Sequence, residues 1–292
     1  MTSGERTIED SVKTDFSTEL SYGRYLELDA VLGAQHPLSD PEHPDEMLFI
    51  IQHQTSELWL KLILHELVAA RAYIDTDDIG QALKALSRVR HVQKVLTEQW
   101  SVLATLTPSE YAGFRGVLGS SSGFQSYQYR AIEFILGNKH PGMLKVFESQ
   151  PEIHAMLQSV LDEPTVYDSF LRYLARHGYA VPQSVLDRDV HEAWVEVPEL
   201  VDVFAEVYNN ETEHWTVYET CEALVDVEDA FQFWRFRHLR TVQRIIGFKT
   251  GTGGSSGIPF LRRALDLTFF PELYSVRTTI ADREVGSKEW RD

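Results

Sequence analysis

The chain has 292 residues, and 44 Asp and Glu against 27 Lys and Arg give it a formal net charge of −17. A surface this acidic repels phosphate groups, so we expect no nucleic-acid partner and no binding to an anionic membrane. The length suffices for a sizeable hydrophobic core. A single cysteine, Cys221, excludes an internal disulfide and favours a cytoplasmic location.

The spacing of glycine and proline predicts long helices. From residue 45 to 107 the only one of either is Gly80, and from 199 to 246 there is none. In chain order, helices are expected from Pro44, from Gln81 to Leu106, from Pro108, from Phe124 to Leu136, from Thr165 to His177 and from Asp229 to Ile246. One break is expected between residues 199 and 246, at Asn209-Asn210 or near Asp226. No alternating run with hairpin turns stands out, so the predicted fold class is all-α, a multi-helix bundle in a single domain over residues 1–292.

Two internal segments are expected to be non-helical. Ala34 to Pro44 holds three prolines and is predicted to form an ordered loop. Thr250 to Gly257 is glycine-rich but lacks the Lys-Ser/Thr pair of a phosphate-binding loop, so it is either a flexible linker or a lid over a substrate. The polar ends, about residues 1–18 and 284–292, are expected to be flexible.

His238 is the histidine most clearly placed on an apolar helix face. Its face contains Phe231, Trp234, Thr241, Val242 and Ile245 at three- and four-residue spacing, whereas Arg237, Arg240 and Arg244 mark another face. A histidine in that position is either a core residue bonded to a carbonyl or an axial haem ligand facing a cavity large enough for a porphyrin. Spacing alone leaves both interpretations open.

Two further pairs could border a ligand site. Phe49 and His53 are four residues apart on one helix face, which suits a cavity wall as well as an ordinary structural histidine. Tyr111 and Arg115 have the same spacing. An arginine beside aromatic groups can bind a carboxylate through its planar fork, but more often it makes a salt bridge.

Other metal and thiol chemistry has weaker support. A di-iron centre in a helical bundle needs two Glu-x-x-His elements, and Glu211-Thr-Glu-His214 has no second copy. That pair is therefore predicted to lie on a solvated helix face. Cys221 has no histidine within one helical turn, which disfavours a cysteine nucleophile.

Seven segments resemble the tryptophan 2,3-dioxygenase family. They are YGRYL at 22–26, MLFIIQHQTSELW at 47–59, TPSEY at 107–111, SSSGFQS at 120–126, FWRFRH at 233–238, GTGGSSG at 251–257 and LTFFPE at 267–272. They follow the order of the family, and no functional position departs from its pattern.

The resemblance implies a haem b whose iron is held axially by His238 and works in the ferrous state. L-Tryptophan and O₂ would be the substrates, and N-formyl-L-kynurenine the product, as the first step of tryptophan degradation. Phe49 would pack against the indole, and His53 would accept its N–H, either as a base or only to position it. Arg115 would clamp the substrate carboxylate with Tyr111 alongside.

The same resemblance implies that Thr252 contacts the amino-acid end of the substrate. It also implies a homotetramer in which an N-terminal helix reaches the neighbour, so that Tyr22, Tyr25 and Leu26 line the active site of another copy. Three alternatives remain: a haem-binding oxygen sensor or carrier without catalysis, a dioxygenase for another indoleamine, and a helical scaffold without cofactor. A sensor or carrier needs neither an arginine clamp nor a closing loop.

Overall fold

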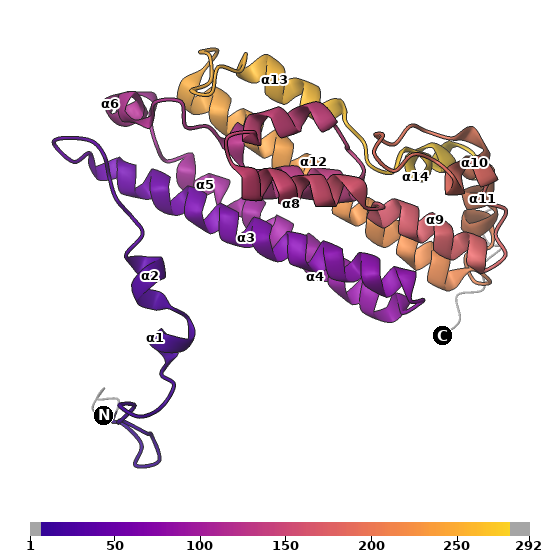
Figure 1. Ribbon diagram of the computed structural model, residues 1–292, viewed down its shortest axis with the longest axis horizontal. Helices are drawn as coiled ribbons and strands as arrows, with labels where there is room; N and C mark the ends of the chain where they lie inside the picture. The colour runs from indigo at the N-terminus through magenta and orange to yellow at the C-terminus, as the bar shows by residue number, and fades with distance from the viewer. Residues whose placement is uncertain (1–6, 281–292) are drawn as a thin grey trace, which may run out of the picture.

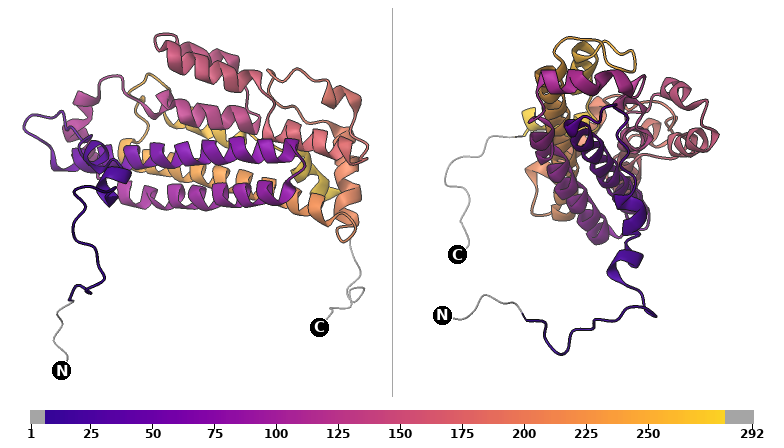
Figure 2. Two further views of the ribbon diagram at one scale, coloured as in Figure 1. Left: turned by 60° about the horizontal axis from the view of Figure 1, so that its bottom comes forward. Right: turned by 90° about the vertical axis from the view of Figure 1, so that its left-hand side faces the viewer.

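The computed structural model describes residues 7–280, and every structural statement here concerns that range. Within it the chain forms helices and no strand, which confirms the predicted all-α class. Three long helices run along the molecule, α3 (Pro44–Asp75), α4 (Ile79–Glu98) and α12 (Trp215–Ile246), and α4 packs against both of the others (Figures 1 and 2). Of the ends expected to be flexible, residues 1–6 and 284–292 lie outside the described range, and residues 7–18 form no helix.

Shorter helices cover this framework. α7 and α9 pack on α3, and α8 packs on α7. The short helices are α1 (Tyr22–Tyr25), α2 (Leu28–Leu32), α5 (Trp100–Leu103), α6 (Pro108–Phe114), α7 (Tyr127–Leu136), α8 (Pro151–Asp162), α9 (Val166–Arg176), α10 (Gln183–Leu186), α11 (Pro198–Asn209), α13 (Ile258–Arg263) and α14 (Pro271–Ser275). The 3₁₀ turns are η1 (Arg115–Leu118), η2 (Gly123–Gln125), η3 (Pro141–Phe147), η4 (Ala264–Asp266) and η5 (Val276–Thr278).

Helix starts follow local sequence signals. α3 begins with proline at its first position, and α6 begins with the predicted capping box, in which Thr107 and Glu110 bond each other's backbone N–H. The break predicted between residues 199 and 246 is confirmed at Asn209–Asn210, where α11 ends. No break occurs near Asp226, so α12 is longer than the expected segment from Asp229.

Two predicted helices are shorter than expected. The helix expected from Gln81 to Leu106 is divided at Gln99. The Gln99 side-chain amide donates to the Ser56 hydroxyl of α3 at 2.6 Å, and local helix propensity does not predict such a tertiary contact. The helix expected from Phe124 begins at Tyr127, because Ser126 caps it by accepting from the Tyr129 N–H at 3.2 Å.

The interpretation of Glu211 and His214 as a solvated helix face was wrong. Both lie in the turn between α11 and α12, and His214 Nδ1 is 2.7 Å from the Tyr179 hydroxyl.

A buried ionic network joins α7 to α12. Glu133 binds Arg235 of α12 at 2.8 Å and also pairs with Arg130 of its own helix, and all three side chains are buried. Buried charges are costly unless they are paired, so this network fixes how the two helices pack. Its effect is to hold α12 in register against the rest of the bundle.

The segment that follows α13 is bound back to α12. The Glu228 carboxylate accepts the backbone N–H groups of Phe269 and Phe270 at 3.0 and 2.9 Å, and Arg235 Nη1 donates to the Ala264 carbonyl at 3.0 Å. Residues 248–270 therefore leave α12 at its end and return to its middle.

The N-terminal arm, residues 7–33, stands apart from the bundle (Figures 1 and 2). The predicted ordered loop follows it, held by the buried Glu46 carboxylate, which accepts the N–H groups of Leu38 and Ser39 at 2.7 and 3.0 Å. Across residues 7–280, no helix is both long enough and apolar enough to cross a membrane.

Candidate active site

The first wall of the site comes from α3. Phe49 and His53 lie one turn apart, with ring centroids 4.2 Å apart and planes at 39°. Phe49 also packs against Tyr111 and Phe114 of α6, at 5.9 and 5.6 Å between centroids. The predicted aromatic and imidazole wall is therefore present, and α6 extends it.

The protonation of His53 follows from its hydrogen bond. His53 Nδ1 is 2.7 Å from the Phe49 carbonyl oxygen, and because a carbonyl only accepts, Nδ1 must carry the proton. Burial lowers the pKa of His53, although the Phe49 bond and the nearby Glu57 oppose this shift. The neutral ring therefore presents an unprotonated Nε2, which is a hydrogen-bond acceptor.

Arg115 follows α6 and faces the glycine-rich loop. Its Nη2 donates to the Thr250 carbonyl at 2.7 Å, while its Nε is buried without a partner among the described residues. Tyr111 is buried one turn earlier, and burial raises its pKa against the opposing effect of Arg115. The guanidinium thus retains an unused donor on its fork beside an aromatic wall.

The glycine-rich loop packs closely on the turn before η2. The Thr252 hydroxyl donates to the Ser121 carbonyl. A Cβ at Gly253 would come within 2.7 Å of Ser122 Cβ, and Gly257, at φ +68°, would place one 2.7 Å from the Lys249 carbonyl oxygen. Only glycine fits these two positions, so the loop has a defined closed shape.

His238 projects from α12 into an aromatic cluster. Its ring stacks on Trp100 at 4.7 Å and 16°, and the Trp234 ring lies 5.4 Å away. Burial, and next the neighbouring His53, lower the pKa of His238 to about 4, so the ring is neutral at physiological pH. Within residues 7–280 its ring nitrogens make no hydrogen bond to protein, unlike the carbonyl-bonded core histidine that was the alternative.

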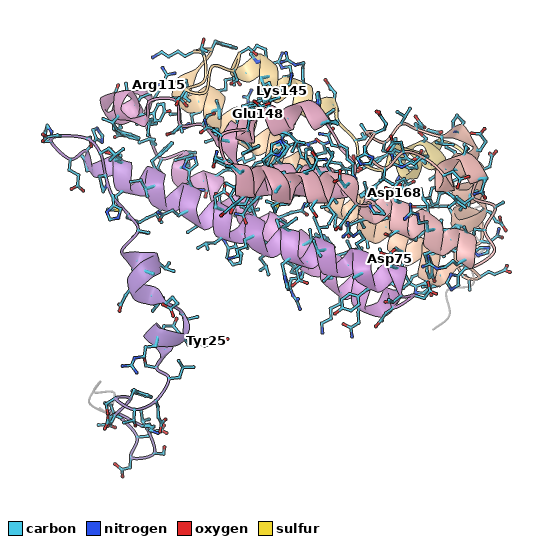
Figure 3. The ribbon with its side chains drawn as sticks, viewed as in Figure 1. Tyr25, Asp75, Arg115, Lys145, Glu148 and Asp168 are labelled. Atoms are coloured by element: carbon cyan, nitrogen blue, oxygen red, sulfur yellow. The ribbon has the colours of Figure 1, made fainter. Side chains whose placement is uncertain are left out.

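The predicted residues divide into two groups. Phe49, Tyr111 and Arg115 join through direct contacts, and His53 lies close enough to His238 to influence its pKa. Tyr22, Tyr25 and Leu26 are 76%, 73% and 39% exposed on the arm. Figure 3 shows Tyr25 far from Arg115, so the arm does not enter the site of its own chain.

Two cavities, of about 270 and 280 Å³, lie away from these residues. One is beside α10, around Arg188 and Trp194, and the other is beside α13, around Phe248 and Arg262. Neither is lined by His238, so the porphyrin-sized cavity expected there is not one of these two.

The residues around His238 nevertheless fit a histidine that binds haem iron. A coordinating imidazole must be neutral and uses a lone pair in the plane of its ring, which stacking on Trp100 leaves free. Three donors near the site, on Trp100 Nε1, Trp234 Nε1 and Arg115 Nε, are buried without partners among the described residues. Unpaired buried donors are unfavourable, so the protein alone leaves this site incomplete.

Trp100 is a site neighbour that the sequence did not reveal. Trp100 reaches His238 because the chain turns at Gln99, and periodicity within either helix gives no sign of that contact. Phe114, by contrast, was expected beside Tyr111 and Arg115 from helical spacing, and it packs there against Tyr111.

Comparison with known proteins gives consistent matches. The family model described as tryptophan 2,3-dioxygenase matches residues 7–201 and 175–280. Similar proteins named tryptophan 2,3-dioxygenase come from Arthrobacter sp. (strain FB24), which is 62% identical over 94% of this chain and 97% of its own, and from Rhodococcus jostii (strain RHA1), with the same values. Another, from Serratia proteamaculans (strain 568), is 56% identical over 94% of this chain and 99% of its own.

Proposed function

The chain belongs to the tryptophan 2,3-dioxygenase family, and on that premise we propose that it inserts both atoms of O₂ across the indole C2–C3 bond of L-tryptophan. The product would be N-formyl-L-kynurenine. The observation that carries the proposal is His238, a neutral imidazole close to His53 that makes no hydrogen bond to any described residue.

His238 would hold haem b by binding its iron. When bound, the ferrous haem would supply the oxygen chemistry, which no amino-acid side chain provides. Trp100 and Trp234 would restrict the rotation of the imidazole, since their rings lie 4.7 and 5.4 Å from it.

The wall on α3 and α6 would bind the indole. Phe49 would pack against the aromatic rings of the substrate and exclude water. His53 Nε2 would accept the indole N–H, because Nδ1 is committed to the Phe49 carbonyl. This bond orients the indole whether or not the proton is transferred.

Arg115 and the glycine-rich loop would bind the amino-acid end. Arg115 would clamp the carboxylate through the part of its fork that Thr250 leaves free, with Tyr111 alongside. Thr252 would contact the same end of the substrate. A charged clamp is needed because an apolar pocket alone discriminates poorly between tryptophan and other indoles.

The arm would complete the site of another copy. Tyr22, Tyr25 and Leu26 are exposed on a segment that leaves the bundle, which suits residues that line a neighbour's site in a homotetramer. A cytoplasmic location and a single domain over residues 1–292 belong to the same proposal.

Absorption spectroscopy of the ferrous protein with O₂, with and without L-tryptophan, tests the proposal. We expect a Soret band and tryptophan-dependent formation of N-formylkynurenine. His238→Ala should lose the Soret band, and added imidazole should restore part of it by occupying the vacated ligand position. A Soret band without product would indicate an oxygen carrier instead, and colourless wild-type protein would refute haem binding.

A further inference from the structure

One exposed face of α12 carries residues that the proposed active site does not use. Apart from one adjacent pair they recur at three- and four-residue spacing, so they share one side of the helix, within an arc of roughly 100°. The set, which we call the α12 stripe, consists of Asp226, Asp229, Phe233, Phe236, Arg237, Arg240 and Arg244, all exposed.

The α12 stripe faces away from the haem ligand. At 100° per residue, His238 lies roughly 140° around the helix from Phe233 and about 160° from Phe236. These two phenylalanines are 60% and 49% exposed. Adjacent exposed aromatic side chains framed by charges are typical of an interface centre with a polar rim.

The charges of the stripe are ordered by sign. The acidic residues Asp226 and Asp229 lie before the two phenylalanines, and three arginines lie after them. A second copy turned end for end would therefore present arginine opposite aspartate. A parallel second copy would place like charges together instead, which is unfavourable.

The antiparallel pairing also matches in register. Asp229 and Arg240 are equally distant from the midpoint between Phe233 and Phe236. A two-fold axis through that midpoint therefore brings Asp229 of each copy against Arg240 of the other. The same axis places Phe233 against Phe236, and it places Asp226 within one residue of Arg244. The stripe is thus complementary to itself.

Existing contacts leave the central pair available. Asp226 already binds Arg90 of α4 at 2.8 Å, and Arg244 Nε donates to the Ala104 carbonyl at 3.0 Å. Asp229 makes no hydrogen bond or ion pair within residues 7–280, and Arg240 bonds only the neutral Gln243 side chain.

We propose that the α12 stripe is an interface at which two copies of this chain associate antiparallel about a two-fold axis. In the proposed homotetramer it would be a second interface beside the arm exchange, because a tetramer with two-fold symmetry needs two different contacts. The pairing of the stripe does not depend on haem or on catalysis.

Charge reversal tests the interface in the full-length protein. We expect sedimentation velocity to show that Asp229→Arg and Arg240→Asp each halve the mass of the assembly, with the interface weakened roughly tenfold or more. Asp75→Arg on α3 and Lys145→Asp on η3 make the same charge changes on exposed side chains away from the stripe, and they should keep the wild-type mass (Figure 3).

Mixing the two single variants gives the sharper result. In a mixed pair the introduced arginine faces the introduced aspartate, and the native Asp229–Arg240 contact is kept on the other side. The mixture should therefore recover the wild-type mass, as should the double variant carrying both changes.

Wild-type mass in both single variants, failure of the mixture to reassemble, or a monomeric wild-type protein would each overturn the inference. The Soret band and tryptophan turnover, recorded on the same samples, report on the proposed function separately. Reassembly of the mixture in protein that lacks haem would uphold the interface and refute only the catalytic proposal.

Discussion

Arg115→Ala probes the discrimination between tryptophan and other indoles. In the structure the guanidinium gives one bond to the Thr250 carbonyl at 2.7 Å and keeps a buried Nε without a partner. A substrate carboxylate on the rest of the fork would gain about two charge-assisted bonds, each worth roughly 1.5–3 kcal/mol. Since Arg115 is only half-buried, we expect a loss of about 2–4 kcal/mol, or roughly 30- to 1000-fold in kcat/KM.

The assay compares L-tryptophan with tryptamine, which lacks the carboxylate. Initial rates of product formation should show that Arg115→Ala removes most of the preference for tryptophan. Arg115→Lys should give an intermediate preference, because lysine keeps the charge but not the fork. Arg172→Ala on α9 is a control for the loss of an arginine at the other end of the bundle (Figure 1).

The ratio of the two substrates separates clamping from loop support. Arg115→Ala also removes the bond to Thr250, but a loosened loop would slow tryptophan and tryptamine alike. Equal losses for both substrates would therefore refute the carboxylate clamp.

Three other predictions concern protons and loop geometry. His53→Ala should raise KM for tryptophan more than it lowers kcat, because a histidine whose pKa is lowered by burial is a weak base. In the wild type, kcat/KM should stay level at neutral pH and fall only at a pH below the usual titration range of histidine. Burial raises the pKa of Glu228 from 4.5 to about 7, so between these pH values the folded state binds more protons than the unfolded state. The free energy of unfolding should therefore fall by up to about 3 kcal/mol as the pH rises through this interval. Chemical denaturation of Glu228→Gln should lack this pH dependence, and an unchanged dependence would assign it to another group. Gly257→Ala places a side chain at φ +68° against the Lys249 carbonyl and should lower kcat/KM for tryptophan. Gly116→Ala is the control, because a Cβ there would meet nothing within 4 Å, and it should leave kcat/KM unchanged. Equal activity of the two variants would show that the loop tolerates another shape.

Features that depend only on neighbouring residues in the sequence, such as helix bounds and pairs on one helix face, could be predicted. The absence of glycine and proline gave the long helices, and the capping box at Thr107 placed the start of α6. The pairing of Phe49 with His53 also followed, since residues four apart share a helix face. Each of these needs only the geometry of one helix.

Features that depend on contacts between distant segments were missed. The turn at Gln99 is supported by Ser56 on another helix, and it brings Trp100 onto His238. The bond from Arg115 to Thr250 likewise joins segments that lie far apart in sequence. Helical periodicity carries no information on such pairs, so the shape of the site could not be derived from it.

The attachment of residues 248–270 to α12 at both ends has a mechanical consequence. This segment is joined to α12 at two points, at the end of the helix and again at Glu228 and Arg235 in its middle. Movement of the glycine-rich loop away from the bundle would break the contacts of Thr250 and Thr252, but it would leave the packing of α12 on α4 intact. Opening of this loop therefore does not require the helix that bears His238 to loosen.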